Sequence, residues 1–409
     1  MRNDSSNNKK FAFNSFVVFI LIILILNFSF NSFKTAFAEN STSQENSEEL
    51  EDQLFDETND ILDDIDTNEL DDYIFNDFNF EFFNVSNFKE IIVKILNGTY
   101  FDEYDSLFSG LVFYFKEGIS SLLSLLLTIL CVVVLFELFK NISTEKYDDF
   151  KRAVSIVFSL VIILILVVVL KNVASVISSS VSQIFSFSQI LFPILLNLIL
   201  LSGATSSFSV YSSLSAFLLN TGSYIFTFIL LPVSVSIMVL TIFGSAFSSK
   251  RCSRIVDIFK SVFKYIIIIF FAIFGLFSTI NMVTSGVKDG VSLRLTKYAI
   301  KNYVPILGGY ISDGFNFVHS CSILVKNAFG VAGILILFII VLKPLINYFV
   351  YLMFFKILSL LTLFVGNTEY SDMFNNISKC MSYFITVLVG IFMIFFIFIY
   401  LLIFSVSVV

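Results

Sequence analysis

Apolar runs about as long as a bilayer is thick recur from residue 119 almost to the end of this chain. Only helices suit such runs, because a crossing takes about twenty residues and backbone groups in lipid must be satisfied within the segment. The chain is 57% hydrophobic and 14% charged, which is more apolar than one soluble core requires. We therefore expect an all-α fold, a polytopic transmembrane helical bundle of about seven to nine spans over residues 119–409. The expected spans are 119–139, 153–170, 184–202, 208–227, 229–247, 261–283, 321–342, 345–365 and 380–407, of which the fourth and fifth could count as one.

The first 38 residues have the pattern of a secretory signal peptide. A basic start is followed by the eleven-residue apolar run Phe16–Leu26, and Ala36 and Ala38 form a small-x-small cleavage site. The run is short for a full span, which favours cleavage over an uncleaved anchor. Either way, we expect the residues after Glu39 to be exported.

An acidic segment follows the signal peptide. Between Glu39 and Glu81 there are seventeen acidic residues and no Lys or Arg. We expect residues 39–70 to be a disordered linker and residues 71–118, which regain apolar residues, to be an exported helical segment at the outer membrane face. The acids lack the glycine and glutamate of a calcium-binding loop, and they would repel nucleic acid.

Basic residues in the short loops predict the orientation. With residues 39–118 outside, the loop around Lys146 and the loop around Arg251 both fall inside, as expected. The basic stretch 288–301 then falls outside, so either the span count is off by one or this region dips into the membrane without crossing. Helical spacing makes stretches 250–264 and 294–301 amphipathic. Lipid anchoring, docking to an acidic partner and lining of an aqueous path all remain open for them.

Polar and helix-breaking residues within apolar runs mark places where a span could be interrupted. Pro193, Asn220 and Pro232 are the candidates for helix breaks. Broken helices build transporter sites, although they also occur in passive packing. Lys326 is costly in lipid and should face the protein interior.

No catalytic or cofactor site is expected. His319 is the one histidine, and the four cysteines stand far apart without metal or redox spacing. The chain has no phosphate-binding or dinucleotide-binding glycine motif. We therefore expect no enzyme activity, no metal and no cofactor.

One stretch resembles a known family. Asp289-Gly-Val-Ser-Leu-Arg-Leu-Thr-Lys-Tyr298, Asn302-Tyr-Val-Pro-Ile-Leu-Gly308, Ser312-Asp-Gly314 and Leu324-Val-Lys-Asn327 are similar to the stage III sporulation protein AE family, as are Phe217–Thr221 and Leu230–Pro232. The resemblance covers roughly residues 119–409. It implies a multi-pass component of a secretion-like channel, or feeding tube, between mother cell and forespore, which supports forespore growth and late forespore gene expression.

The resemblance also implies a setting and partners. The protein would lie in the mother-cell membrane that engulfs the forespore, with its exported segment in the intermembrane space. Its partners would be other stage III A sporulation proteins and a forespore membrane protein, and whether it forms an oligomer stays open. The alternative is a stand-alone small-molecule transporter. Candidates for an assembly or gate element, which could equally fix a turn and an interfacial helix, are Arg294, Lys297, Asn302, Pro305, Gly308, Asp313, Lys326 and Asn327.

Overall fold

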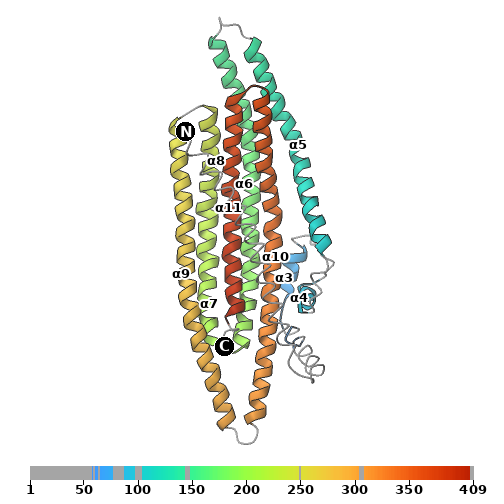
Figure 1. Ribbon diagram of the computed structural model, residues 1–409, viewed down its shortest axis with the longest axis vertical. Coiled ribbons are helices and arrows are strands. Elements are labelled where there is room, and N and C mark those ends of the chain that lie inside the picture. Colours follow the sequence, from blue (N-terminus) through green and yellow to red (C-terminus); the bar gives the residue numbers. More distant parts are fainter. Residues whose placement is uncertain are drawn as a thin grey trace. The chain divides into compact units, whose positions relative to one another are not determined.

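The computed structural model of the chain forms two compact units, residues 1–61 and residues 62–409. The structure describes residues 58, 60–62, 65–76, 87–96, 104–142, 148–247, 250–303 and 308–405. The signal peptide expected over residues 1–38 and most of the linker expected over residues 39–70 lie outside the described residues. Since only three described residues belong to the first unit, the architecture below is that of the second (Figure 1).

The described residues of the second unit are helical and contain no strand. Two short α-helices and a π-helical segment come first, and longer helices follow to the C-terminus. They are α3 (Asn68–Asp71), η1 (Asp72–Asn76), α4 (Phe88–Leu96), α5 (Tyr104–Ile142), α6 (Asp148–Leu201), α7 (Thr205–Phe217), η3 (Leu218–Gly222), η4 (Ile225–Leu230), α8 (Leu231–Ala246), α9 (Lys250–Tyr303), α10 (Gly308–Phe364) and α11 (Thr368–Phe404).

Six helical elements among the described residues are long and apolar enough to cross a membrane, where the sequence suggested up to nine spans. They are Val112–Lys140, Ala153–Leu201, Thr205–Ala246, Arg251–Ile280, Gly314–Phe364 and Thr368–Phe404. The second, third and fifth each join two expected spans into one element. The helix continues through the polar stretch 171–183 between two expected spans, where the hydroxyl of Ser180 is satisfied by the carbonyl of Val176 one turn back, at 2.7 Å.

Helices α10 and α11 form the centre of the bundle, and α6 and α8 pack against them. Phenylalanine rings fill these contacts, as in the edge-to-face pair of Phe192 and Phe398, whose centroids are 4.6 Å apart. Gly333 lets α10 approach α6, because a Cβ there would lie 2.5 Å from Cδ2 of Leu191. Helices α5 and α9 lie at the periphery and expose apolar side chains along much of their length, as expected for surfaces that meet lipid.

The short N-terminal helices pack against the bundle. In α4, Phe88, Ile91, Ile92 and Ile95 are buried, and the Phe88 ring lies 5.4 Å from that of Phe329 in α10. Tyr73 in η1 donates to the carbonyl of Gln183 in α6 at 2.8 Å. Part of the expected disordered linker is thus ordered, since Asn68–Leu70 are helical and Leu70 is fully buried. Helix α5 begins at Tyr104, within the range 71–118 expected as the exported segment.

Candidate functional site

A tight turn joins α6 to α7 at the end of the bundle where α9 approaches α10. The turn contains Ser202, Gly203 and Ala204, and Gly203 has φ of +80°, which is unfavourable for residues with a Cβ. A Cβ at Gly203 would also lie 3.1 Å from Leu293 of α9. The backbone conformation therefore favours glycine here, and a Cβ would in addition crowd the Leu293 side chain.

A carboxylate from another helix caps the start of α7. The N-cap residue, Ala204, has no side-chain acceptor. Instead, Oδ1 of Asp289 in α9 accepts the Ser206 N–H at 2.8 Å, and Oδ2 accepts the Ser207 N–H at 2.7 Å. Asp289 is fully buried, and its negative charge lies at the positive end of the α7 dipole. This one residue therefore ties α7 to α9.

His319 of α10 holds the other side of the same turn. Its Nδ1 donates to the carbonyl of Ser202 at 2.8 Å, and its ring stacks on Phe315 one turn earlier. Lys297 and Lys326 lie near enough to act on the imidazole electrostatically. We call the set Ser202, Ser206, Ser207, Asp289 and His319 the turn clasp, because it joins α6, α7, α9 and α10.

Lys326 fixes the end of α11. Its side chain is fully buried, and Nζ donates to the carbonyl of Ile403 at 2.7 Å. A buried ammonium group needs such a partner because desolvation is costly. The neighbouring Asn327 has a buried Oδ1 with no hydrogen-bond partner among the described residues.

The predicted assembly residues are partly brought together. Lys297 and Lys326 both lie close to His319, whereas Arg294 and Asn302 are exposed and Asn302 donates to its own helix at Tyr298. Gly308 begins α10 and Asp313 lies in its first turns. Pro305, Ala36 and Ala38 lie outside the described residues.

The predicted helix breaks have different outcomes. Helix α6 runs through Pro193 without interruption, so the break expected there is not seen. Asn220 lies in the π-helical segment η3, where its side-chain amide donates to the carbonyl of Ala216. Pro232 follows η4 and stands in the first turn of α8. The departure from regular α-helix therefore lies between residues 218 and 230.

Helix α9 carries an exposed apolar stripe next to the turn clasp. The stripe consists of Val287, Val291, Leu295 and Tyr298, which are 54–66% exposed. Exposed basic residues flank it: Lys288 on one side, and Arg294 and Lys301 on the other. The acid of this part of α9, Asp289, is buried in the clasp. We call these seven residues the α9 stripe, an amphipathic surface suited to a partner with apolar and acidic groups.

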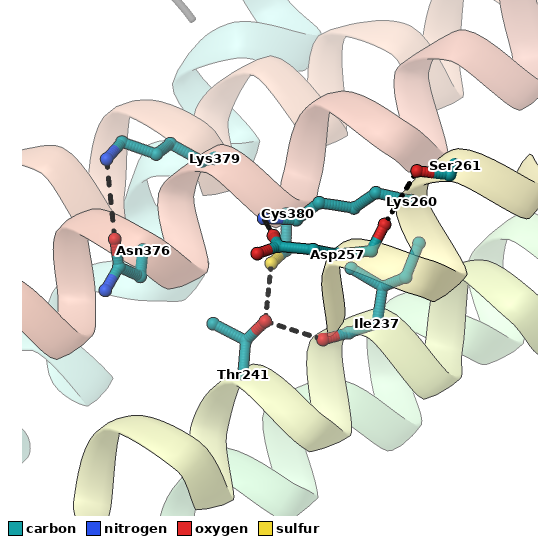
Figure 2. Close-up of polar contacts among 8 residues, drawn as sticks. All are labelled: Ile237, Thr241, Asp257, Lys260, Ser261, Asn376, Lys379 and Cys380. Atoms are coloured by element: carbon teal, nitrogen blue, oxygen red, sulfur yellow. Dashed lines mark hydrogen bonds and ion pairs between the residues drawn. The ribbon is translucent and has the colours of Figure 1, made fainter. Parts of the chain in front are cut away.

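A second set of polar contacts lies nearer the opposite ends of α8, α9 and α11 (Figure 2). Thr241 donates to the carbonyl of Ile237 at 2.6 Å and accepts the thiol of Cys380 at 3.3 Å. Lys260 pairs with Asp257 at 3.5 Å within α9. These contacts are local and hold helices in register, with no arrangement of groups toward a substrate.

The polar groups of the turn clasp are used to hold helices together. No group of three His, Cys, Asp or Glu residues that could hold a metal is present in the described part of the chain. The oxygens of Asp289 accept backbone N–H groups, and His319 faces a carbonyl. Both residues were named from the sequence but neither was chosen as a site residue, although Asp289 is the one acid between Asp257 and Asp313. The position of Asp289 as a single acid among basic residues was the sequence signal that could have identified it.

Comparison with known proteins gives two matches. The family model for stage III sporulation protein AE matches residues 86–406. A Bacillus subtilis (strain 168) protein named stage III sporulation protein AE is 26% identical over 223 residues, which are 54% of this chain and 55% of the relative. The match thus spans about half the length of that relative. No solved structure matches the chain.

Proposed function

Because the chain belongs to the stage III sporulation protein AE family, we propose that it is a structural membrane component of a secretion-like channel between mother cell and forespore. In this role it supports forespore growth and late gene expression during endospore formation. Its partners are the other stage III A proteins and a protein of the forespore membrane. The proposal gives the chain no catalytic role and no cofactor.

The α9 stripe is the observation that carries the proposal. A stand-alone protein gains nothing from a surface that exposes Leu295 and Tyr298 by more than half, since large exposed apolar patches mark interaction sites. The flanking Arg294 and Lys301 give the surface a charge that selects acidic partners. The turn clasp and Leu293 fix the opposite face of the same helix, so the stripe is presented on a rigid element.

The orientation supports access by partners. With the residues before α5 outside, six crossings place the α5–α6, α8–α9 and α10–α11 connections inside and the α9–α10 hairpin outside. The basic residues of the α9 stripe then lie on the exported side, against the positive-inside pattern. Binding to a partner in the intermembrane space gives a reason for keeping them there.

The test is the yield of heat-resistant spores in a deletion strain with the gene restored from a promoter active only in the mother cell. We expect loss of spores on deletion and full rescue from the mother cell. Rescue only by expression in the forespore would contradict the membrane assigned here. Normal spore yield after deletion would remove the proposal.

A transporter that acts alone is the second candidate, and the π-helical segments η3 and η4 favour it. Such segments are rare and are frequent at functional sites, and they lie between two apolar stretches of one element. A stand-alone transporter would change solute uptake in vegetative cells that produce this protein without the other stage III A proteins. A channel component would leave uptake unchanged in those cells.

A further inference from the structure

The exposed surface of α6 changes character at Lys171. Before it, the exposed side chains are mainly large and apolar, and Leu164 is 67% exposed. Between residue 171 and the end of α6 at Leu201 most exposed side chains are polar, and the exceptions are Pro193, Leu200 and Leu201. The polar ones are Lys171, Asn172, Ser175, Ser178, Ser179, Ser182, Gln189 and Asn197. One continuous helix therefore presents a surface typical of lipid in one half and a surface typical of water in the other.

The α7–α8 element shows the same change. Its exposed side chains from Thr205 to Asn220 are polar or small, namely Thr205, Ser209, Ser213, Ala216 and Asn220. From Tyr224 to Phe247 the large exposed side chains are aromatic. The order of the two halves is reversed relative to α6, as it must be because the two elements are antiparallel and joined by a short turn.

Three exposed lysines lie where the surface changes from apolar to polar on the side of the bundle formed by α5, α6 and α10. Lys116 of α5, Lys171 of α6 and Lys343 of α10 are all exposed. Gly118 lies against Val350, and Tyr348 donates to the carbonyl of Val173 at 2.7 Å. These two contacts show how far along the bundle axis α5, α6 and α10 stand relative to one another. Counting 1.5 Å per residue from the contacts to each lysine, the three lysines lie within about 10 Å of one another along that axis. We call them the lysine belt.

The apolar surface beyond the belt matches the thickness of one bilayer. The rise from Lys171 back to Arg152 is about 28 Å, and from Tyr224 to Phe247 it is about 34 Å. A hydrocarbon core is about 30 Å thick. The complete apolar stretch of α6, Ala153–Leu201, is about 72 Å long, and no usual helix tilt fits that length into one bilayer.

The small helix α4 provides independent support. It packs on α10 at Phe329, which is about 21 Å beyond Lys343 on the side away from the apolar surface. Its outer face carries the ion pair of Lys94 and Glu90, at 3.6 Å. Charged groups of both signs on an outer face are expected in water and not in lipid.

We propose that the lysine belt binds anionic phospholipid headgroups and marks where the bilayer ends. Helix α6 beyond Lys171 and α7 before Tyr224 stand in water on the side of α3 and α4. A groove of about 490 Å³ on α5 is lined by Lys116, Phe115, Ile119 and Leu123, so a headgroup phosphate at Lys116 has apolar side chains for its acyl chains.

The boundary is slanted across the bundle. Gly222, near the change on α7–α8, packs beside Phe185, which is about 21 Å further along α6 than Lys171. The bundle therefore crosses the bilayer at a tilt. The projecting parts of α6 and α7 meet at the turn clasp. This inference concerns the position of the bilayer and does not rest on the sporulation role.

The first experiment measures water access to single cysteines in the full chain. Cys131, Cys252, Cys321 and Cys380 are replaced, and one cysteine is placed at Asn197, Ser213, Leu164 or Met353. Membranes opened by freezing and thawing are treated with a membrane-impermeant maleimide. We expect Asn197→Cys and Ser213→Cys to react as fast as Lys301→Cys at the end of α9, and Leu164→Cys and Met353→Cys about ten-fold more slowly, because a thiolate must form in water.

The same residues test the competing arrangement. If residues 184–202 and 208–227 crossed the bilayer, Asn197→Cys and Ser213→Cys would be protected like Leu164→Cys. If these cysteines were protected from the maleimide and also formed disulfides between two copies of the chain, the polar surface would be an interface between copies within the membrane. Either result would overturn the proposal.

The second experiment tests the lipid. The triple variant Lys116→Gln, Lys171→Gln, Lys343→Gln is purified from membranes and supplied with phosphatidylglycerol or phosphatidylcholine, and bound lipid is counted by native mass spectrometry. We expect the variant to lose phosphatidylglycerol and the triple lysine-to-arginine variant to keep it. Equal retention by the glutamine variant and by a Lys379→Gln control would exclude headgroup binding at the belt.

Discussion

Asp289 of α9 accepts the backbone N–H of Ser207 at the start of α7, 2.7 Å away. The capping group comes from 82 residues further along the chain, so the start of α7 is set by tertiary structure. Loss of this contact affects the position of α9 as well as α7.

Replacement of Asp289 by Asn should lower stability. The carboxylate accepts two N–H groups and faces the helix dipole, so we expect a loss of about 2 kcal/mol in unfolding free energy. Thermal unfolding of the purified protein in detergent measures it. Asp257→Asn is the control, because Asp257 is exposed and pairs only within its helix. Equal effects of the two variants would contradict the capping role.

Replacement of Lys326 by Met should loosen the end of α11 without unfolding the bundle. Methionine fills a similar volume but cannot donate to Ile403. We therefore expect faster hydrogen exchange over residues 400–405, with protection elsewhere unchanged. Lys379→Met is the control, since Lys379 is exposed and 3.4 Å from Asn376. Unchanged exchange at the C-terminal turn of K326M would show that apolar packing alone holds it.

Gly333 and Gly275 should respond in opposite directions to alanine. At Gly333 a Cβ would lie 2.5 Å from the buried Leu191, whereas at Gly275 nothing lies within 4 Å. We expect Gly333→Ala to lose about 1–3 kcal/mol through overpacking and Gly275→Ala to gain about 0.5–1 kcal/mol from helix propensity. Chemical unfolding in mixed micelles gives both values, and a neutral Gly333→Ala would mean that α6 can move aside.

Charge reversal at Arg294 and Lys297 should block sporulation while leaving the protein in the membrane. Arg294 belongs to the α9 stripe, and Lys297 lies one turn further along α9, half-buried on the side of His319. We expect the double glutamate variant to be inserted at the normal level and to yield about a hundred-fold fewer heat-resistant spores, because a like-charge contact disfavours an acidic partner by several kcal/mol. The control is the double variant Arg294→Lys, Lys297→Arg, which keeps both positive charges. A strain that carries it should sporulate normally. Wild-type yield in the reversed variant would remove these residues from the assembly surface.

The sequence predicted the helical class and the membrane setting well, but it divided the helices wrongly. The stretch 171–183 contains five serines, and its polarity suggested a loop between two spans. Within α6 their side chains satisfy local carbonyls or face outward, so the helix continues. Hydropathy alone reports which residues avoid water and not where a helix ends, and no glycine or proline stands at that point to stop it.

The candidate site was predicted in part. The basic residues of the α9 stripe could be found because their helical spacing is local. Asp289 and His319 could not be assigned in the same way, since their partners are the α6–α7 turn and lie 82 and 117 residues away in the sequence. Local patterns contain no information about such contacts. A buried carboxylate among basic residues becomes interpretable only when the neighbouring helix start is known.

The unbroken course of α6 has a mechanical consequence. A helix without a joint bends only gently, so the twist or axial shift of one end is imposed on the other. Helix α6 connects the α5–α6 loop with the turn clasp over about 80 Å. A load applied where α9 meets the clasp is thus transmitted across the whole thickness of the membrane by one continuous helix.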